Sequence, residues 1–217
     1  MIKIGDILEV EKYIGGLRAV IFDLDDTLYS EKEYVRGGFR AVAKSLPEIQ
    51  DAEEKLYLLF ESGKPAIDYL LRSEGVYSDE LKEKCLNVYR AHTPDIHLYG
   101  GVREMLVRLR QEGYMLGIIT DGRPGGQRAK ISVLGLDSLV DEIIITDELG
   151  GTEARKPSGK AFLLMHERLN KISGEKIDYS EMCYVGDNTA KDFIAPASLG
   201  MRAIWFENPE GLYHNSF

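Results

Sequence analysis

A chain of 217 residues, of which 44% are hydrophobic and 29% charged, is long enough for one substantial core, or for a core plus a smaller inserted domain. Its formal net charge of -9 at pH 7 and its pI near 5.1, with no cluster of Lys or Arg, argue against a protein that wraps nucleic acid. Small anionic substrates stay compatible with this charge if a metal ion or a few lysines reverse the local field.

No targeting or membrane segment is expected from the sequence. Residues 1–16 mix acidic residues among the apolar ones, so neither a signal peptide nor a membrane span is expected there. The two cysteines, Cys85 and Cys183, lie far apart and follow no metal-ligand spacing, which favours reduced thiols over a disulfide or a zinc site. The sequence therefore predicts a cytoplasmic protein without membrane attachment.

Short apolar runs rich in β-branched residues predict five buried strands. They cover residues 19–22, 116–119, 143–145, 183–185 and 203–206. Helical patterns alternate with most of them, at residues 102–111, about 126–134, 160–169 and 191–199, several ending at a glycine that suits a helix C-cap. This alternation predicts an α/β fold, a doubly wound parallel sheet of the Rossmann-like kind.

One interval breaks the alternation of strands and helices. Residues 31–97 contain no convincing strand, only helical stretches around residues 35–46, 52–61, 66–72 and 79–90. We interpret residues 31–97 as an all-helical inserted domain, so that residues 1–30 and 98–217 form the α/β core.

Side chains that can carry chemistry follow three of the predicted strands. The carboxyl ends of parallel strands meet at one edge of a sheet, where active sites of open α/β folds form. The candidates are Asp23 and Asp25 after the first run, Thr120 and Asp121 after the second, Asp187 after the run that ends at Gly186, and Lys156 ahead of the helix after the third.

Carboxylates crowded at one point are tolerable when a divalent cation lies among them. The candidates offer oxygen ligands and no histidine or cysteine, which makes Mg²⁺ the expected ion. A hydrated Mg²⁺ often takes a phosphate as a further ligand, and the Thr120 hydroxyl and the Lys156 ammonium could donate to the same phosphate. The set of residues therefore predicts phosphoryl transfer.

Phosphate monoesters hydrolyse extremely slowly unaided, so the site must place a nucleophile in line with the leaving group. A carboxylate can attack phosphorus and form an acyl phosphate that water then cleaves, and we assign this role to Asp23. Asp25 is predicted to protonate the leaving alkoxide and later to activate water, with neighbouring carboxylates pushing it toward its acid form. Asp26 is expected to point elsewhere, because adjacent side chains in an extended segment diverge.

Four segments, in their order along the chain, resemble the motifs of the haloacid dehalogenase (HAD) superfamily. They are DLDDTL at residues 23–28, the threonine at residue 120, the lysine at residue 156 before a proline, and GDNTAKD at residues 186–192. The resemblance spans residues 20–206 and implies a phosphatase-type HAD hydrolase with a Rossmann-like core. It also implies that the helical insertion is a cap domain, of the type placed between the first and second motifs.

The resemblance further implies individual roles. Asp23 would carry an aspartyl phosphate, and Asp25 would act as acid and base. The Asp23 carboxylate, the Asp25 backbone carbonyl and Asp187 would bind Mg²⁺, with Asp192 in support. The phosphate would contact Thr120, the backbone amide of Asp121, and Lys156.

The function we expect is a Mg²⁺-dependent phosphatase for a small phosphomonoester, such as a sugar phosphate or a nucleoside monophosphate. A phosphomutase with the same motifs is one alternative, and a binding or scaffold protein that keeps the fold without turnover is another. Related dehalogenases lack the second aspartate, so Asp25 counts against that activity. The expected partner is a small phosphorylated metabolite, and the oligomeric state stays open.

Two features depart from the motifs or lie just outside them. The second motif reads TDG where many relatives have asparagine, and the charge of Asp121 could favour cationic or hydroxyl-rich leaving groups. Arg123, Gln127 and Arg128 follow this motif and could face the pocket. We expect instead that they are surface residues, because helices commonly present such side chains to solvent.

Overall fold

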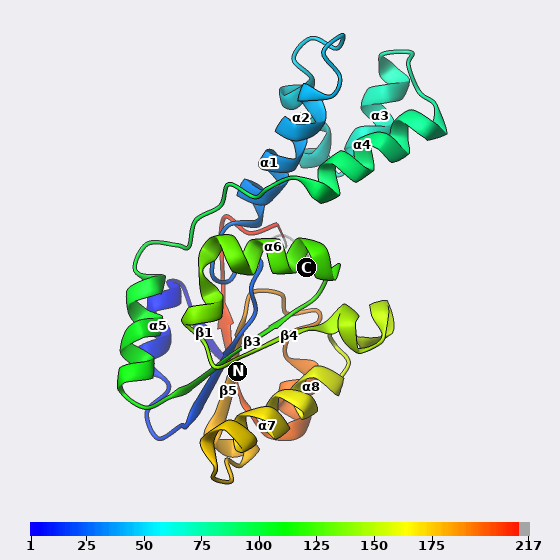
Figure 1. Cartoon of the computed structure of the whole chain (residues 1–217). Coiled ribbons are helices and arrows are strands. Elements are labelled where there is room, and N and C mark those ends of the chain that lie inside the picture. The colour runs from blue at the N-terminus through cyan, green and yellow to red at the C-terminus, as the bar shows by residue number, and fades with distance from the viewer. Residues whose placement is uncertain (213–217) are drawn as a thin grey trace. The chain divides into compact units, whose positions relative to one another are not determined.

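The chain divides into two compact units, of which the larger is built around a six-stranded parallel sheet (Figure 1). A computed structural model describes residues 1–212. The larger unit comprises Met1–Glu31 and the chain from Ile96 onward, and the smaller unit comprises Lys32–Asp95.

All five predicted strands are present, each within one residue of its expected start and end. The strands are β1 (Ile2–Ile4), β2 (Ala19–Phe22), β3 (Met115–Thr120), β4 (Glu142–Ile145), β5 (Met182–Gly186) and β6 (Arg202–Phe206). Strand β1 was not predicted; it has three residues and pairs with β6 at one edge of the sheet. Its brevity leaves too few alternating positions for a pattern to be recognised.

The strand order is β1-β6-β5-β2-β3-β4, with every pair parallel. From β2 the chain moves outward through β3 to β4, and then returns to the other side of β2 to form β5 and β6. This reversal makes β2 the switch point of the sheet, and ligands of open α/β sheets bind outside the carboxyl ends of strands at such a point. The predicted doubly wound fold is confirmed.

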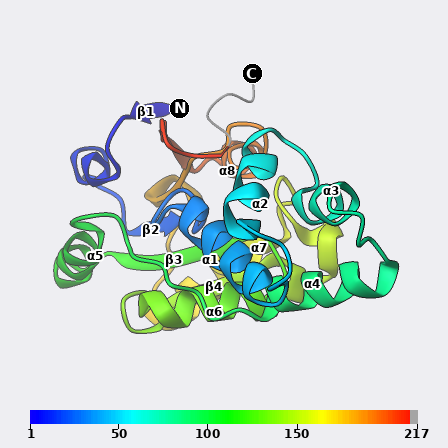
Figure 2. The same cartoon turned by 90° about the horizontal axis from the view of Figure 1, so that it is seen from above.

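Four helices flank the sheet (Figures 1 and 2). They are α5 (Val102–Gln111), α6 (Pro124–Leu134), α7 (Lys160–Ser173) and α8 (Ile194–Leu199), and short 3-10 turns lie at Ile7–Lys12, Leu136–Ser138, Thr146–Leu149, Gly151–Ala154 and Tyr179–Glu181. Helix α8 begins three residues later than predicted. The preceding residues instead form a turn in which the backbone amides of Lys191 and Asp192 donate to the carbonyl of Asn188.

The core of the larger unit lies between the sheet and its helices. On one face, side chains of β2 and β5 such as Ile21 and Tyr184 pack with Phe162, Met165 and Leu169 of α7. All of these side chains are almost completely buried. Val20 and Phe22, which alternate with Ile21 along β2, are also fully buried. Burial on both faces of the sheet explains why the strands are continuous apolar runs and not alternating patterns.

The smaller unit is entirely helical. Its helices are α1 (Glu31–Lys44, whose first residue belongs to the larger unit), α2 (Ala52–Glu61), α3 (Ala66–Ser73) and α4 (Asp79–Ala91). One apolar cluster joins them, and it includes Phe39, Leu56, Leu70 and Cys85. Cys85 and Cys183 are both buried and unpaired. Within residues 1–212, no helix has the length and apolar character needed to cross a bilayer.

Candidate active site

The ends of three neighbouring strands lie at the same level of the sheet. Phe22, the last residue of β2, pairs with Ile118 of β3 on one side and with Val185 of β5 on the other. The backbone amide of Asp23 then donates to the carbonyl of Val185, at 2.8 Å. The loops that follow β2, β3 and β5 therefore start side by side, as the sequence predicted.

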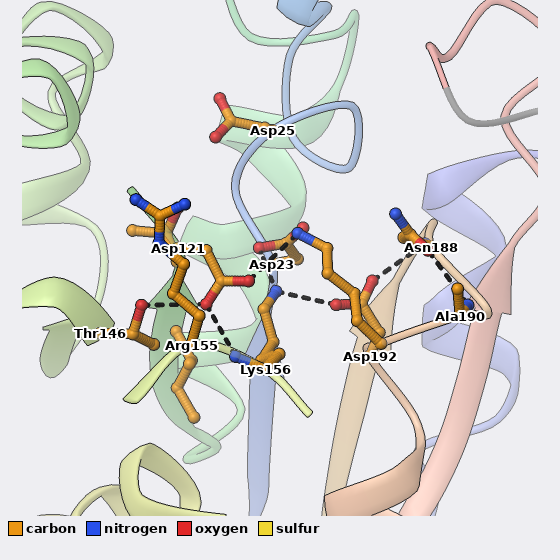
Figure 3. A network of polar contacts seen from close by, with 12 residues as sticks. Asp23, Asp25, Asp121, Thr146, Arg155, Lys156, Asn188, Ala190 and Asp192 are labelled. Atoms are coloured by element: carbon orange, nitrogen blue, oxygen red, sulfur yellow. Dashed lines mark hydrogen bonds and ion pairs between the residues drawn. The ribbon is translucent and has the colours of Figure 1, made fainter. Parts of the chain in front are cut away.

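Lys156 lies at the centre of the charged groups at this edge (Figure 3). Its Nζ is 2.7 Å from Asp23 Oδ1, 2.8 Å from Asp192 Oδ1 and 2.8 Å from the hydroxyl of Tyr184. The Lys156 side chain is completely buried, and burial alone would favour its neutral form. Asp192 and Asp23 outweigh this effect and raise the pKa of Lys156 well above its ordinary value, so the lysine is charged.

Three carboxylates converge beside this lysine. Oxygens of Asp23, Asp187 and Asp192 lie within 4.8 Å of one another, and we call these residues the acidic cluster. Burial, and then the charges of Asp23 and Asp192, raise the pKa of Asp187 to about 9. Burial, and then the charge of Asp192, raise the pKa of Asp23 to about 6, against the opposing effect of Lys156.

The acidic cluster fits a divalent cation. Its donors are all carboxylate oxygens, which hard ions such as Mg²⁺ prefer. The raised pKa of Asp187 shows that the protein alone supplies too little positive charge for all three carboxylates. The side chain of Asp25 is not part of the cluster, so the contribution expected from that residue is its backbone carbonyl only.

The loop after β5 holds Asp192 in place. Asp192 Oδ2 accepts a hydrogen bond from the backbone amide of Asn188 at 2.9 Å, and Asn188 Oδ1 accepts one from the amide of Ala190 at 3.0 Å. Gly186 provides the necessary space, because a Cβ at this position would lie 2.5 Å from Asp192 Oδ2. The glycine of the GDNTAKD motif therefore lets the supporting carboxylate pack against the strand.

The side chain of Asp121 has a structural role. Its Oδ1 accepts hydrogen bonds from the Thr146 hydroxyl at 2.9 Å and from the backbone amide of Lys156 at 3.1 Å, and its Oδ2 lies 3.1 Å from Lys191 Nζ. Both oxygens thus have partners inside the protein. The expectation that its charge would favour particular leaving groups is not supported, because that charge is already paired with Lys191.

Asp25 lies apart from the acidic cluster, and in Figure 3 its side chain extends away from Asp23 and Lys156. Lys130 Nζ is 2.7 Å from Asp25 Oδ1, and Gln127 Nε2 donates to Asp25 Oδ2 at 2.8 Å. The Tyr29 hydroxyl also donates to Asp25 Oδ1. We call Tyr29, Gln127 and Lys130 the Asp25 cradle.

The environment of Asp25 differs from the predicted one. We expected neighbouring carboxylates to raise the pKa of Asp25 toward the acid form. Burial does act in that direction, but Lys130 and the hydrogen bonds of the cradle outweigh it and lower the pKa. The prediction was wrong because it considered the acidic residues beside Asp25 in sequence and not the lysine that helix α6 brings to it.

Gln127 connects the two parts of the site. Its Nε2 lies within hydrogen-bonding distance of Asp25, of the Thr120 hydroxyl and of the backbone carbonyl of Asp121. Its side chain is buried, so the prediction that it lies on the surface is wrong, whereas Arg123 and Arg128 are exposed as predicted. Thr120 is also buried, and in this structure its hydroxyl contacts Gln127.

Sequence reasoning missed Lys130 and Glu31 altogether. Burial, and then the charge of Asp25, raise the pKa of Glu31 to about 8, while Lys130 opposes this shift. The backbone amide of Glu31 donates to Asp26 Oδ1 at 2.9 Å, and Asp26 Oδ2 accepts from the amide of Leu212 at 2.8 Å. Asp26 is therefore a structural residue that points elsewhere, as predicted.

Asp187→Asn is expected to flatten the pH dependence of stability in the absence of metal. The Asp187 pKa rises from 3.8 to about 9 on folding. The corresponding stability is present below the unfolded value and is lost as the pH rises through the folded value. Asparagine does not ionise, so the variant should lose less stability between about pH 5 and pH 9. Melting temperatures of the wild type and the variant, measured in EDTA across this pH range, test the expected difference in pH dependence.

The exposed Asp137→Asn variant should follow the wild type and serves as the matched control. Added Mg²⁺ should stabilise the wild type more at high pH than at low pH, because metal binding requires deprotonated carboxylates. The same addition should have little effect on Asp187→Asn. Parallel melting curves for wild type and Asp187→Asn at every pH would contradict the assignment of Asp187 to the acidic cluster.

Comparison with known proteins places this arrangement in a family. A profile described as haloacid dehalogenase-like hydrolase matches residues 20–206. A glyceraldehyde 3-phosphate phosphatase from Pyrococcus abyssi is 31% identical over 204 residues, which cover 88% of this chain and 82% of that protein.

Solved structures show the same fold. A HAD phosphatase from Thermococcus onnurineus has a TM-score of 0.55 at 27% identity, with 87% of this chain and 86% of that chain covered. A magnesium-bound HAD hydrolase from Bacillus subtilis has a TM-score of 0.65 at 20% identity, with 88% and 87% covered. With its fold, its four motifs and the profile match over most of its length, the chain belongs to the haloacid dehalogenase-like hydrolases.

Proposed function

We propose that this protein is a Mg²⁺-dependent phosphatase that hydrolyses a small phosphomonoester through an aspartyl phosphate on Asp23. One observation carries the proposal: Asp23 follows the central strand directly and lies beside a charged lysine and two further carboxylates. The named function of the Pyrococcus abyssi relative supports a phosphatase. It agrees with the activity expected from the sequence.

In the first half-reaction, an oxygen of Asp23 bonds to phosphorus as the bond between phosphorus and the leaving oxygen breaks. Lys156 supplies positive charge to the phosphoryl oxygens, and the Thr120 hydroxyl and the Asp121 backbone amide supply hydrogen bonds. The Thr120 oxygen accepts a hydrogen bond from Gln127, so that contact leaves its own proton available for the phosphate. Asp25 takes up a proton when the dianionic phosphomonoester binds beside it, because the added negative charge favours the acid form. It then gives this proton to the leaving oxygen, which departs as an alcohol.

In the second half-reaction, water cleaves the aspartyl phosphate. Asp25, now ionised, takes a proton from the water as its oxygen bonds to phosphorus and the bond to Asp23 breaks. Inorganic phosphate leaves, and both aspartates return to their starting states. The sum of the two steps is one phosphomonoester and one water converted to one alcohol and one phosphate.

Asp23, Asp187 and the backbone carbonyl of Asp25 are proposed to hold Mg²⁺, with Asp192 in support. When bound, the ion would supply positive charge that the acidic cluster lacks and would neutralise phosphate oxygens. A magnesium-bound structure of the Bacillus subtilis HAD hydrolase agrees with this choice of metal.

A phosphorylated sugar is the substrate class that we propose, and a triose phosphate is the first compound to test. The support is the function named for the Pyrococcus abyssi relative, which spans most of both chains. We propose that residues 1–30 and 98–217 carry the chemistry and that residues 31–97 are a separate cap domain. The unpaired, buried cysteines fit a reducing compartment, and we propose the cytoplasm.

A panel assay tests the function. The purified protein is incubated with Mg²⁺ and a set of triose phosphates, hexose phosphates, nucleoside monophosphates and pyrophosphate, and both free phosphate and remaining phosphoesters are measured. Phosphate release from the sugar phosphates is expected, and it should stop in EDTA. An isomerised sugar phosphate without free phosphate would establish the mutase instead. No turnover of any compound would favour a binding protein.

Asp25→Ala is expected to slow turnover most for substrates with poor leaving groups. An alkoxide cannot leave without a proton, whereas nitrophenolate can, so only the first needs the acid. The loss of kcat/KM should be about 10²- to 10⁴-fold for an alkyl phosphate and much smaller for p-nitrophenyl phosphate. Equal losses for the two substrates would contradict the role of Asp25 as proton donor.

A further inference from the structure

The Asp25 cradle is a set of buried polar side chains with one common target. Tyr29, Gln127 and Lys130 are each less than 5% exposed. Burying an amide, a hydroxyl and an ammonium group costs free energy unless each has a partner. All three donate to the carboxylate of Asp25. This carboxylate is therefore the shared partner that makes the burial of three polar groups tolerable.

The geometry of the cradle fixes the carboxylate at both of its oxygens. Oδ1 receives Lys130 Nζ at 2.7 Å and the Tyr29 hydroxyl, and Oδ2 receives Gln127 Nε2 at 2.8 Å. A carboxylate held at both oxygens cannot rotate freely about its terminal bond. The Asp25 carboxylate is therefore oriented by the protein and not by solvent.

The three donors come from two segments of the chain. Gln127 and Lys130 are three residues apart on α6, so they project from the same face of one helix. Tyr29 forms a backbone bridge with Asp25, and its ring centroid lies 5.8 Å from Lys130 Nζ. The cradle thus joins the loop after β2 to the helix that follows β3.

We propose that Lys130, together with Gln127 and Tyr29, positions Asp25 for proton transfer to the leaving oxygen of the phosphomonoester. This inference rests on the proposed phosphatase function and adds to it a set of residues that do not touch the substrate. The cradle acts through Asp25, so Lys130, Gln127 and Tyr29 are positioning residues.

The contact with Lys130 fixes one oxygen of the Asp25 carboxylate. The ammonium group lies 2.7 Å from Oδ1, and Tyr29 and Gln127 hold the carboxylate at Oδ1 and Oδ2, so its orientation toward the leaving oxygen is set before the proton moves. Lys130 keeps its own protons throughout. The later proton transfer from water returns Asp25 to its earlier protonation state, and Lys130, Gln127 and Tyr29 are chemically unchanged over the cycle.

The test compares rates across a series of aryl phosphates with different leaving groups. The slope of log kcat/KM against leaving-group pKa measures how far protonation assists departure. Lys130→Met is expected to make this slope steeper, toward that of Asp25→Ala, with a loss of about 10²-fold for the poorest leaving group. Tyr29→Phe, which removes only one hydroxyl, is expected to change the slope in the same direction by less.

Arg128→Met is the matched control on the same helix. Arg128 is exposed and pairs with Glu148, so its replacement should leave the slope unchanged. A second comparison places Lys130→Met in the Asp25→Ala background, where the inference predicts no further change of slope. Melting temperatures establish which variants fold, and if Lys130→Met does not fold, Lys130→Arg and Tyr29→Phe are compared instead.

The outcomes separate this inference from the proposed function. If wild type hydrolyses the series and Asp23→Asn does not, the phosphatase assignment stands. A uniform loss for all leaving groups in Lys130→Met would then overturn the cradle alone. A slope change that persists without the Asp25 carboxylate would also overturn it. If wild type and Asp23→Asn are equally inactive on every phosphoester, the proposed function itself fails.

Discussion

Asp23→Asn is expected to abolish phosphate release, with a fall in kcat of about 10⁴-fold or more. The amide of asparagine is a poor nucleophile, so the bond to phosphorus cannot form at this position. The measurement is release of nitrophenolate from p-nitrophenyl phosphate in Mg²⁺. Asp137→Asn changes an exposed aspartate in the same way and should retain wild-type activity.

The same variant should not be destabilised in the absence of metal. Folding raises the pKa of Asp23 from 3.8 to about 6. The stability linked to Asp23 is therefore present below the unfolded value and is lost as the pH rises through the folded value. At neutral pH, replacing this carboxylate should leave the melting temperature in EDTA equal or higher. Loss of activity together with a marked fall in melting temperature would instead indicate a residue needed for folding.

The main residues of the site could be predicted because the carboxyl ends of parallel strands meet at one edge of a sheet. Asp23 and Asp187 each follow a strand of a parallel sheet directly, and such strand ends lie side by side whatever the separation in sequence. Lys156 was predicted because it lies near the start of the helix after the third run, from which it can reach the same edge, and the motif resemblance agreed. The structure places its ammonium group beside both Asp23 and Asp192.

The Asp25 cradle was harder to predict, although a signal for it exists. The buried residues of α6 are Gln127, Lys130, Ile131 and Leu134, which are spaced by three, one and three residues. This spacing is that of a single helix face, so the two polar residues share a stripe with two core residues. The prediction that Gln127 is exposed did not take into account its spacing from Lys130, Ile131 and Leu134. The full helical stripe would have indicated burial.

The distance relationships within the site could not be obtained from sequence. Nothing in the spacing of residues 25 and 130 shows that a lysine lies 2.7 Å from the second aspartate of the first motif. That contact depends on how α6 packs beside the loop after β2. For the same reason, the direction of the pKa shift of Asp25 was predicted wrongly, since Lys130 and the hydrogen bonds from Tyr29 and Gln127 together lower this pKa.

Lys156→Met is expected to cause the largest combined loss of stability and activity. The ammonium group lies within 2.8 Å of both Asp23 and Asp192, and its side chain is fully buried. Removing one partner of a buried ion pair leaves uncompensated charge and typically costs about 3–5 kcal/mol. The loss of a donor to the phosphoryl oxygens should in addition lower kcat/KM by about 10²- to 10³-fold.

The dependence of this loss on pH and metal identifies its cause. Lys156 lowers the pKa of Asp23, so without it that pKa rises. Protonation at low pH then relieves the repulsion in the acidic cluster, and the variant should approach wild-type stability there. Added Mg²⁺ should recover part of the stability at neutral pH, because it supplies charge to the same carboxylates. Lys160→Met, at an exposed position four residues on, is the control. A loss that is independent of both pH and Mg²⁺ would mean that Lys156 acts through packing, and not by balancing the acidic cluster.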